Sequence, residues 1–222
     1  MIRASTLATL ASACVGLIAA SPARAQISEV DASRVVLVGG GPLTGHVETE
    51  AENNLGSITS GYDTDAAGLV GVQYETPLVP YLSLVARFQA VRFHYTSANR
   101  QHRTFFDFGV APTATFAVDA GKLRIEPRLG VPVGFTLHLA NQEEETGLDL
   151  IGVSRANAGW HVGMLTGAHL GASHGSGFAG RLGGFFELGF LHHSAYASGD
   201  NDTKYRLRVN QFVIQVGLSV TL

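Results

Sequence analysis

The run His192-His193-Ser194 is the stretch of this sequence whose side chains could carry out catalysis. A serine hydroxyl is a weak nucleophile alone, and an imidazole that accepts its proton makes it reactive. His192 and Ser194 are two residues apart, so on a β-strand their side chains would point to the same face. A third, acidic group would be needed on the neighbouring strand to orient the histidine. The last segment of the chain offers Arg206 and Arg208 there instead.

The pair resembles a local feature of the lipid A deacylase (PagL-like) barrels, which carry a His-any-Ser on an outward face. The resemblance implies an acyl hydrolase with His192 as base and Ser194 as nucleophile. The asparagine that usually follows the serine in that family is Ala195 here. We therefore favour the other interpretation, a plain His/Ser pair at a membrane interface, and expect no enzyme activity.

Seven charged residues form a second group, because each falls on the polar side of an alternating segment. They are Arg87, Asp107, Arg124, Glu126, Arg128, Arg181 and Glu187. The interior of an eight-stranded barrel is only just wide enough for side chains, so such charges should pair with one another. Leaving one of them dry and unpaired would be strongly destabilising. The group predicts a structural plug or, as its nearest elaboration, a narrow gated pore.

Acidic residues in predicted loops give a third candidate, a site for divalent cations shared with lipopolysaccharide phosphates. They are Glu48, Glu50, Glu52, Glu143, Glu144, Glu145, Asp200 and Asp202. No calcium-loop spacing appears among them, and solvated loops are commonly acidic without any ligand. His161 and His169 are too far apart on one strand to share a metal, so we interpret them as hydrogen-bonding residues. We expect no metal and no cofactor.

Alternating segments are the elements that would position all these residues. Eight occur, at about 34–45, 67–76, 82–95, 104–118, 123–139, 158–171, 178–194 and 204–222. A period of two is typical of a strand with one apolar and one polar face. Short connections alternate with long ones, which places all short turns at one end of an up-and-down array. The first segment, from Val35 to Gly41, shows no defensible alternation.

Lysine indicates which face is outside. Soluble sheet proteins use lysine to prevent pairing at strand edges and to keep exposed sheet faces hydrated. Lys122 and Lys204 are the only lysines here. The polar side of the segments is instead glycine, alanine, threonine and glutamine with a few opposite charges, which is typical of a crowded lumen. In hydrocarbon every backbone group must be paired internally, so a closed barrel is expected.

Aromatic and proline positions refine this picture. We expect one aromatic girdle at the loop end and another at the turn end. The loop-end set is Phe106, Phe135, Trp160, Phe190 and Phe212, and the turn-end set is Tyr74, Tyr81, Phe116 and Phe178. Pro112, Pro127 and Pro132 fall inside predicted strands, where each removes a ladder donor, so we expect bulges there.

The start of the chain has the layout of a secretory signal peptide, with Arg3, an uncharged run from Leu7 to Ala20, and Ala23-Arg24-Ala25. Cleavage before Gln26 would remove Cys14, the only cysteine, which excludes thiolate catalysis and cysteine-bound metals. Residues 26–222 would then form one domain with 13 basic and 18 acidic side chains, a net charge near −5. We expect no nucleic-acid partner, because no basic stripe is present.

The last eight residues, QVGLSVTL, complete the pattern. Gln215, Gly217, Val220 and Leu222 resemble the carboxy-terminal assembly signal of outer-membrane barrels. With the signal peptide and eight segments, the chain resembles the small barrels of the OmpA and OmpX type, without a peptidoglycan-binding domain. That family usually ends in Phe, and this chain ends in Leu222.

The resemblance implies an all-β fold, an eight-stranded antiparallel up-and-down transmembrane β-barrel in the bacterial outer membrane. It also implies insertion by the barrel assembly machinery, which reads the last strand. Outer-membrane lipid and lipopolysaccharide are the expected surroundings of a monomer with a structural or surface-interaction role.

Overall fold

The computed structural model describes residues 26–28, 30, 32–65, 68–95, 102–141, 148–172, 181–200 and 202–222. The predicted signal peptide, Phe178 and the acidic run 143–145 lie outside these ranges. Twelve strands are present: β1 Gln26–Ser28, β2 Arg34–Asn53, β3 Gly56–Asp65, β4 Leu69–Val79, β5 Leu82–Tyr95, β6 His102–Thr115, β7 Ala117–Ala120, β8 Leu123–Gly130, β9 Val133–Ala140, β10 Ala156–Ala172, β11 Leu182–Ser198 and β12 Lys204–Thr221. No helix in the described ranges is long and apolar enough to cross a membrane.

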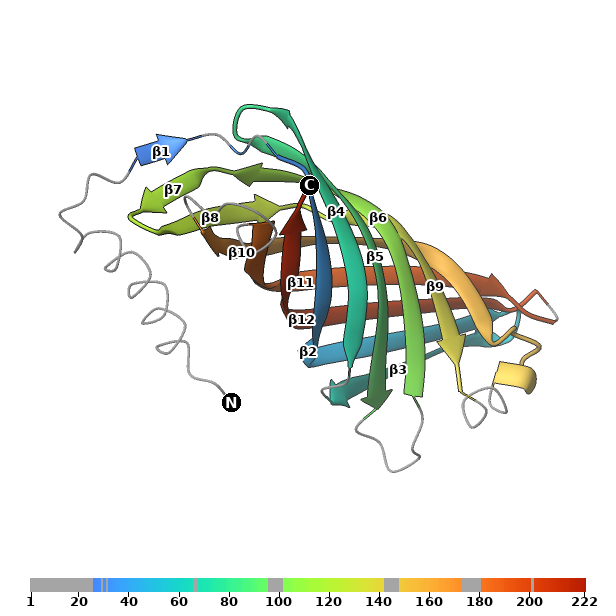
Figure 1. Ribbon diagram of the computed structural model, residues 1–222. Coiled ribbons are helices and arrows are strands. Elements are labelled where there is room, and N and C mark those ends of the chain that lie inside the picture. Colours follow the sequence, from blue (N-terminus) through green and yellow to red (C-terminus); the bar gives the residue numbers. More distant parts are fainter. Residues whose placement is uncertain are drawn as a thin grey trace.

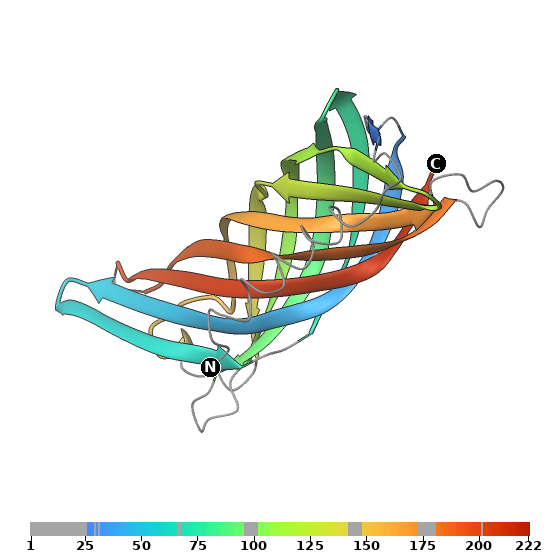
Figure 2. The same cartoon turned by 90° about the vertical axis from the view of Figure 1, so that its left-hand side faces the viewer.

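These strands form a closed antiparallel ring (Figures 1 and 2). The ring has eight positions, which we call staves, because some positions are made of two strands. The order around the ring is β2, β4, β5, β6, the β8/β9 pair, β10, β11 and β12, and β12 pairs back to β2. β3 continues β4 beyond the barrel, β7 continues β6, and β1 pairs with β7. The predicted eight-stranded antiparallel up-and-down β-barrel is confirmed.

The two ends of the barrel differ in their connections. The tight turns at residues 80–81 and 121–122 lie at the same end as Leu222, and we call this the turn end. The backbone N–H of Leu222 donates to the Ser33 carbonyl at 2.9 Å, so β12 is paired up to its last residue. The opposite, loop end carries the turn at 54–55 and residues 148–155, 199–200 and 202–203.

A bulge explains why the first segment showed no alternation. On β12, Phe212 pairs with Thr44 and Val213 pairs with Pro42, so Leu43 on β2 has no partner. One extra residue reverses which side chains face inward. Val36 and Val38 are therefore buried below the bulge, whereas Val47 is buried above it.

The expectation of bulges at the three prolines is wrong. Pro112 and Pro127 pair without a register shift, opposite Leu84 and Ala168 respectively. Pro132 lies in a short break between β8 and β9, but the register is the same on both sides of it. A missing N–H therefore interrupts the ladder locally here without inserting a residue.

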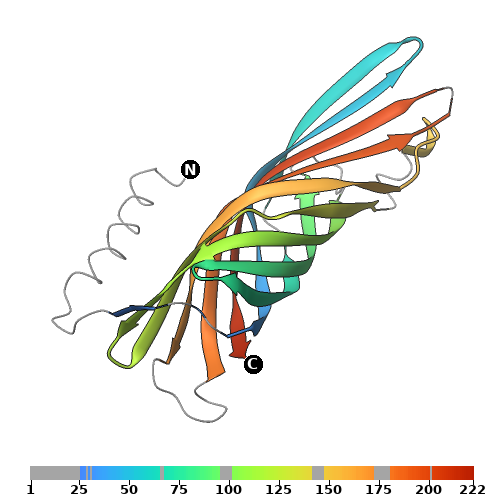
Figure 3. The same cartoon turned by 90° about the horizontal axis from the view of Figure 1, so that it is seen from above.

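The predicted long loop at 46–66 is also different. β2 and β3 pair from Gly45–Thr64 to Asn53–Gly56, so this region is a hairpin that continues two staves beyond the barrel. β11 and β12 extend at the same end, paired as far as Ser198 and Lys204. Figure 3 shows the two hairpins projecting together, and we call them the extramembrane sheet.

Burial alternates along the strands, and it follows the predicted polar and apolar sides of β12 from Gln215 to Leu222. On β12 the odd-numbered residues face inward and are buried from Tyr205 to Val213 and again at Gln215 and Ser219, whereas Val216 and Leu218 are 52% and 69% exposed on the outside. Exposed rings on the outer face include Phe108, Phe135, Trp160, Phe190 and Tyr196. The arrangement of the predicted aromatics at two levels stays a prediction.

Candidate functional site

The lumen brings together most of the predicted charges. Arg87, Asp107, Glu126, Arg128 and Glu187 are all at least 93% buried. Glu187 lies between two arginines, with Oε2 3.1 Å from Arg87 Nη1 and Oε1 3.0 Å from Arg128 Nε. The buried Arg87, Arg128 and Glu187 thus meet opposite charges, which offsets the large cost of removing them from water.

The ion pairs continue to the turn end through residues outside the predicted group. Arg128 Nη1 donates to Glu75 Oε2 at 2.8 Å, and His169 Nε2 lies 3.2 Å from the same oxygen and also contacts Arg128. Arg34 Nη2 is 2.5 Å from Glu126 Oε2. Glu126 Oε1 accepts a second bond from the half-buried Arg124 at 2.8 Å.

Toward the middle of the barrel, amides replace charges. Gln215 Oε1 accepts hydrogen bonds from Arg87 at 2.9 Å and from Gln73 at 3.2 Å. Gln215 Nε2 donates to Gln89, which donates to Asp107 Oδ2 at 2.9 Å. His193 Nε2 lies 3.1 Å from that same oxygen. We call this connected set, from Arg124 and Arg34 to His193, the lumen network.

The sequence analysis missed several members of this network. Arg34 lies in the segment without alternation, so its direction was not predictable. Gln73 and Glu75 do alternate with Val72 and Tyr74, and that pattern could have revealed them. Gln215 was predicted only as part of an assembly signal, yet its side chain sits at the centre of the network.

Arg181 is the predicted lumen charge that the structure does not place in the network. It precedes β11, is exposed, and makes no hydrogen bond or ion pair with the described residues. The strand β11 begins only at Leu182, one residue after Arg181.

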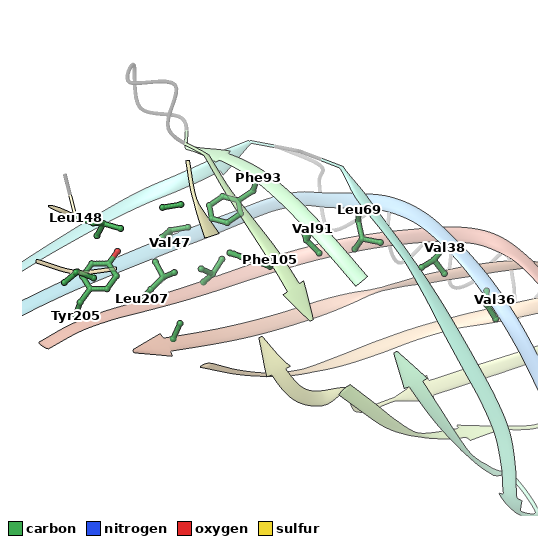
Figure 4. Packing of buried hydrophobic residues seen from close by; sticks show 14 of the residues in the cluster. Val36, Val38, Val47, Leu69, Val91, Phe93, Phe105, Leu148, Tyr205 and Leu207 are labelled. Atoms are coloured by element: carbon green, nitrogen blue, oxygen red, sulfur yellow. The ribbon is translucent and has the colours of Figure 1, made fainter. Parts of the chain in front are cut away.

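The loop-end half of the lumen is mainly apolar, which the sequence analysis did not anticipate, although the fully buried Arg103 also lies there and donates to the Tyr205 hydroxyl at 2.9 Å. Val47, Val91, Phe93, Phe105, Leu207 and Val209 are each fully buried (Figure 4). Leu148 and Val153, from the segment after β9, pack against the same cluster. We call these eight residues the apolar plug. The Phe105 ring lies 4.9 Å from the His193 ring, so the plug meets the lumen network directly.

The outer face changes character at one level. Every outward side chain of the last strand from Phe212 to Leu222 is apolar. This stretch is 11 residues long. A tilted strand needs about 9–11 residues to cross hydrocarbon. Above Phe212 the outward residues are Asn210, Arg208, Arg206 and Lys204. The membrane boundary therefore lies between Asn210 and Phe212.

The His192/Ser194 pair lies at this boundary. His192 Nδ1 is 2.8 Å from Asn210 Oδ1, and the imidazole lies 5.2 Å from the Trp160 ring. Ser194 is only 2% exposed, between Trp160 and Arg208 on the two flanking strands, and no hydrogen bond joins it to His192. A buried serine without its base is not positioned to attack a lipid ester.

Two acidic side chains of β2 that were candidates for cation binding are already paired with arginines. Glu48 and Glu50 lie in a strand rather than a loop, opposite a basic row on β12. Arg208 donates to Glu48 at 2.8 Å and Arg206 to Glu50 at 3.4 Å. Within the ranges that the structure covers, no group of three or more metal-binding side chains comes together. Asp200 and Asp202 lie in the turn before β12.

A closed ring of eight strands with an apolar outer band and a filled polar interior defines a small β-barrel of the outer-membrane type. Its place is the bacterial outer membrane.

Solved structures with a similar strand arrangement are known. Neisserial surface protein A is 14% identical, with 84% of this chain and 97% of that chain covered and a TM-score of 0.39. OprG, an outer-membrane protein of Pseudomonas aeruginosa, is 10% identical over 88% and 98% of the two chains, with a TM-score of 0.42. Ail, the attachment invasion locus protein of Yersinia pestis, is 10% identical over 86% and 99%, with a TM-score of 0.27.

No protein-family model and no curated protein matches the chain. The class is therefore assigned from this chain's own strand pairing and outer face.

Proposed function

We propose that this protein is a sealed outer-membrane barrel, without enzyme activity, that anchors and presents its extramembrane sheet at the cell surface. The observation that carries the proposal is the filling of the lumen from the middle of the barrel to the loop end. The lumen network occupies the turn-end and middle parts, and the apolar plug occupies the loop-end part. A path for ions would need both to move.

The plug is the stronger barrier. A hydrated ion loses its water in an apolar constriction, and the buried guanidinium of Arg103 beside the plug would repel a cation. The six fully buried plug residues come from β2, β5, β6 and β12, so the constriction is closed from different sides of the ring.

A narrow gated pore is the second candidate, and one observation favours it. The lumen network is a continuous polar path from Arg124 at the turn end to Asp107 in the middle of the barrel. In such a pore the apolar plug would act as the gate. The gate would have to open toward the segment at Leu148, which caps the loop end.

The surface role rests on the extramembrane sheet. Its outer face carries the paired Glu48/Arg208 and Glu50/Arg206 rows, so it is polar but locally neutral. Its hairpin tip is different, because Leu55 and Ile58 are 96% and 72% exposed. Exposed apolar side chains on an otherwise charged projection favour contact with another surface.

Planar-bilayer recording of the refolded barrel separates the two candidates. The parent should be silent at all voltages. Phe105→Ala, which removes the largest link between plug and network, should be the first variant to leak, and Phe88→Ala on the outer face is its matched control. Gated openings in the parent would contradict the sealed barrel and support the pore. Silence in parent and both variants would leave the pore without support.

A further inference from the structure

A cavity of about 280 Å³ lies at the turn end of the lumen. Its walls come from the beginnings of β2, β8 and β11, the ends of β10 and β12, and residues 30 and 32. Barrels of this type place their short turns on the periplasmic side. The cavity therefore faces the periplasm, at the far end from the apolar plug, and members of the lumen network form part of its wall.

The charged groups on its walls are mainly guanidinium groups. Arg34, Arg124 and Arg181 line it, against the single carboxylate of Glu126. Arg34 and Glu126 form the buried floor, at 5% and 6% exposure, and Arg181 is exposed at the rim. Glu75 also approaches Arg34 and Asp119 approaches Arg124, both from outside the cavity.

Two of these arginines retain unused donors. Arg34 Nε is buried and makes no hydrogen bond, because Glu75 Oε2 lies 3.7 Å away. Arg181 has no partner among the residues that the structure describes. A buried guanidinium N–H without an acceptor is costly, so Arg34 can take one more acceptor.

We propose that this cavity binds a small organic oxyanion, a carboxylate or a phosphate ester, from the periplasm. The guanidinium fork matches the two oxygens of either group. The hydroxyl-bearing residues Ser219 and Thr221 also line the cavity, and Leu170 and Leu182 form an apolar wall that suits a short carbon body.

Isothermal titration calorimetry of the refolded mature barrel in detergent micelles tests the site. Inorganic phosphate and succinate are the probes, and glycerol is the neutral control. We expect saturable binding of at least one anion by the parent. Arg181→Gln should weaken it about tenfold, the loss expected for one charge-assisted hydrogen bond. Arg206→Gln, an arginine at the loop end, should bind like the parent.

Each outcome decides the matter. Binding of phosphate alone or succinate alone identifies which oxyanion the site takes. Failure of the parent to bind either anion overturns the proposal. Equal affinity in the parent and Arg181→Gln, or an equal loss in Arg206→Gln, also overturns it, because binding would then lie elsewhere. Heat-modifiable migration on gels confirms that each variant is folded, and none of these outcomes bears on conductance.

Discussion

Removing the carboxylate of Glu187 is the sharpest perturbation of the lumen network. This carboxylate is 1% exposed and is shared by Arg87 and Arg128. Glu187→Ala leaves both guanidinium groups in the lumen, where Glu75 and Gln215 remain as acceptors and His169 as a further contact of Arg128. Two like charges would then face each other across the space that the carboxylate filled.

The expected cost follows from burial. Breaking a buried ion pair by deleting one partner destabilises a protein by about 3–5 kcal/mol, because the remaining charge is left uncompensated. Glu187 neutralises two arginines, so we expect a value at the upper end of that range. Glu187→Gln keeps an acceptor for one arginine and should lose less.

Urea unfolding of the refolded barrel in micelles measures this free energy. Trp160 is the only tryptophan, and it lies on β10 next to β11, so its fluorescence reports on the affected staves. Glu48→Ala is the matched control, since it breaks the exposed 2.8 Å pair with Arg208. An exposed pair contributes about 0–1 kcal/mol. If Glu187→Ala costs no more than Glu48→Ala, the lumen network does not stabilise the barrel as argued.

Two further predictions concern the last strand and the outer rim. Leu222→Phe should reach the outer membrane as folded barrel at least as well as the parent, whereas Leu222→Asp should assemble poorly; heat-modifiable migration of membrane fractions measures both. The direct membrane penalty near the interface is only about 0–1 kcal/mol, so a large defect would come from recognition of the strand, and normal assembly of the Asp variant would refute its role as a signal. Mass spectrometry of lipid A should give identical acyl patterns for cells that make the parent and cells that make Ser194→Ala. The reason is that Ser194 is buried and His192 is bound to Asn210. A loss of acyl chains that Ser194→Ala abolishes would establish the hydrolase.

The sequence was sufficient to predict the ring of strands and the side on which most charges lie. A period of two repeats over each stave, and glycine and charge on one side cannot face hydrocarbon. Arg87, Asp107 and Glu187 were predicted to lie inward on that ground, and they do. Their individual partners were not predictable, because cross-barrel contacts depend on the stagger between staves.

Three features were beyond that reasoning. The bulge at Leu43 hides the alternation of β2, since one unpaired residue reverses it. β3 consists largely of glycine, serine, threonine and aspartate, a composition typical of loops, and becomes a strand only by pairing with β2.

The apolar plug was missed for a different reason. Phe105 and Phe106 are adjacent, and both are large and apolar, so the sequence does not distinguish a ring that fills the lumen from one that faces lipid. Closure of the strands into a ring decides which of the two aromatic rings faces inward. Phe105 is fully buried, and Phe106 is half-buried on the outer side.

The most direct test of the membrane-spanning barrel is an accessibility scan of β12 with spin labels. The predicted mature chain has no cysteine, so single cysteines can be placed at Asn210, Phe212, Val213, Val216 and Leu218. In lipid bilayers, labels at Phe212, Val216 and Leu218 should collide with oxygen and not with a water-soluble nickel reagent. The label at Asn210 should show the reverse, and the inward label at Val213 should meet neither. Nickel collisions at Val216 and Leu218 as frequent as at Asn210 would contradict a lipid-facing band that begins at Phe212.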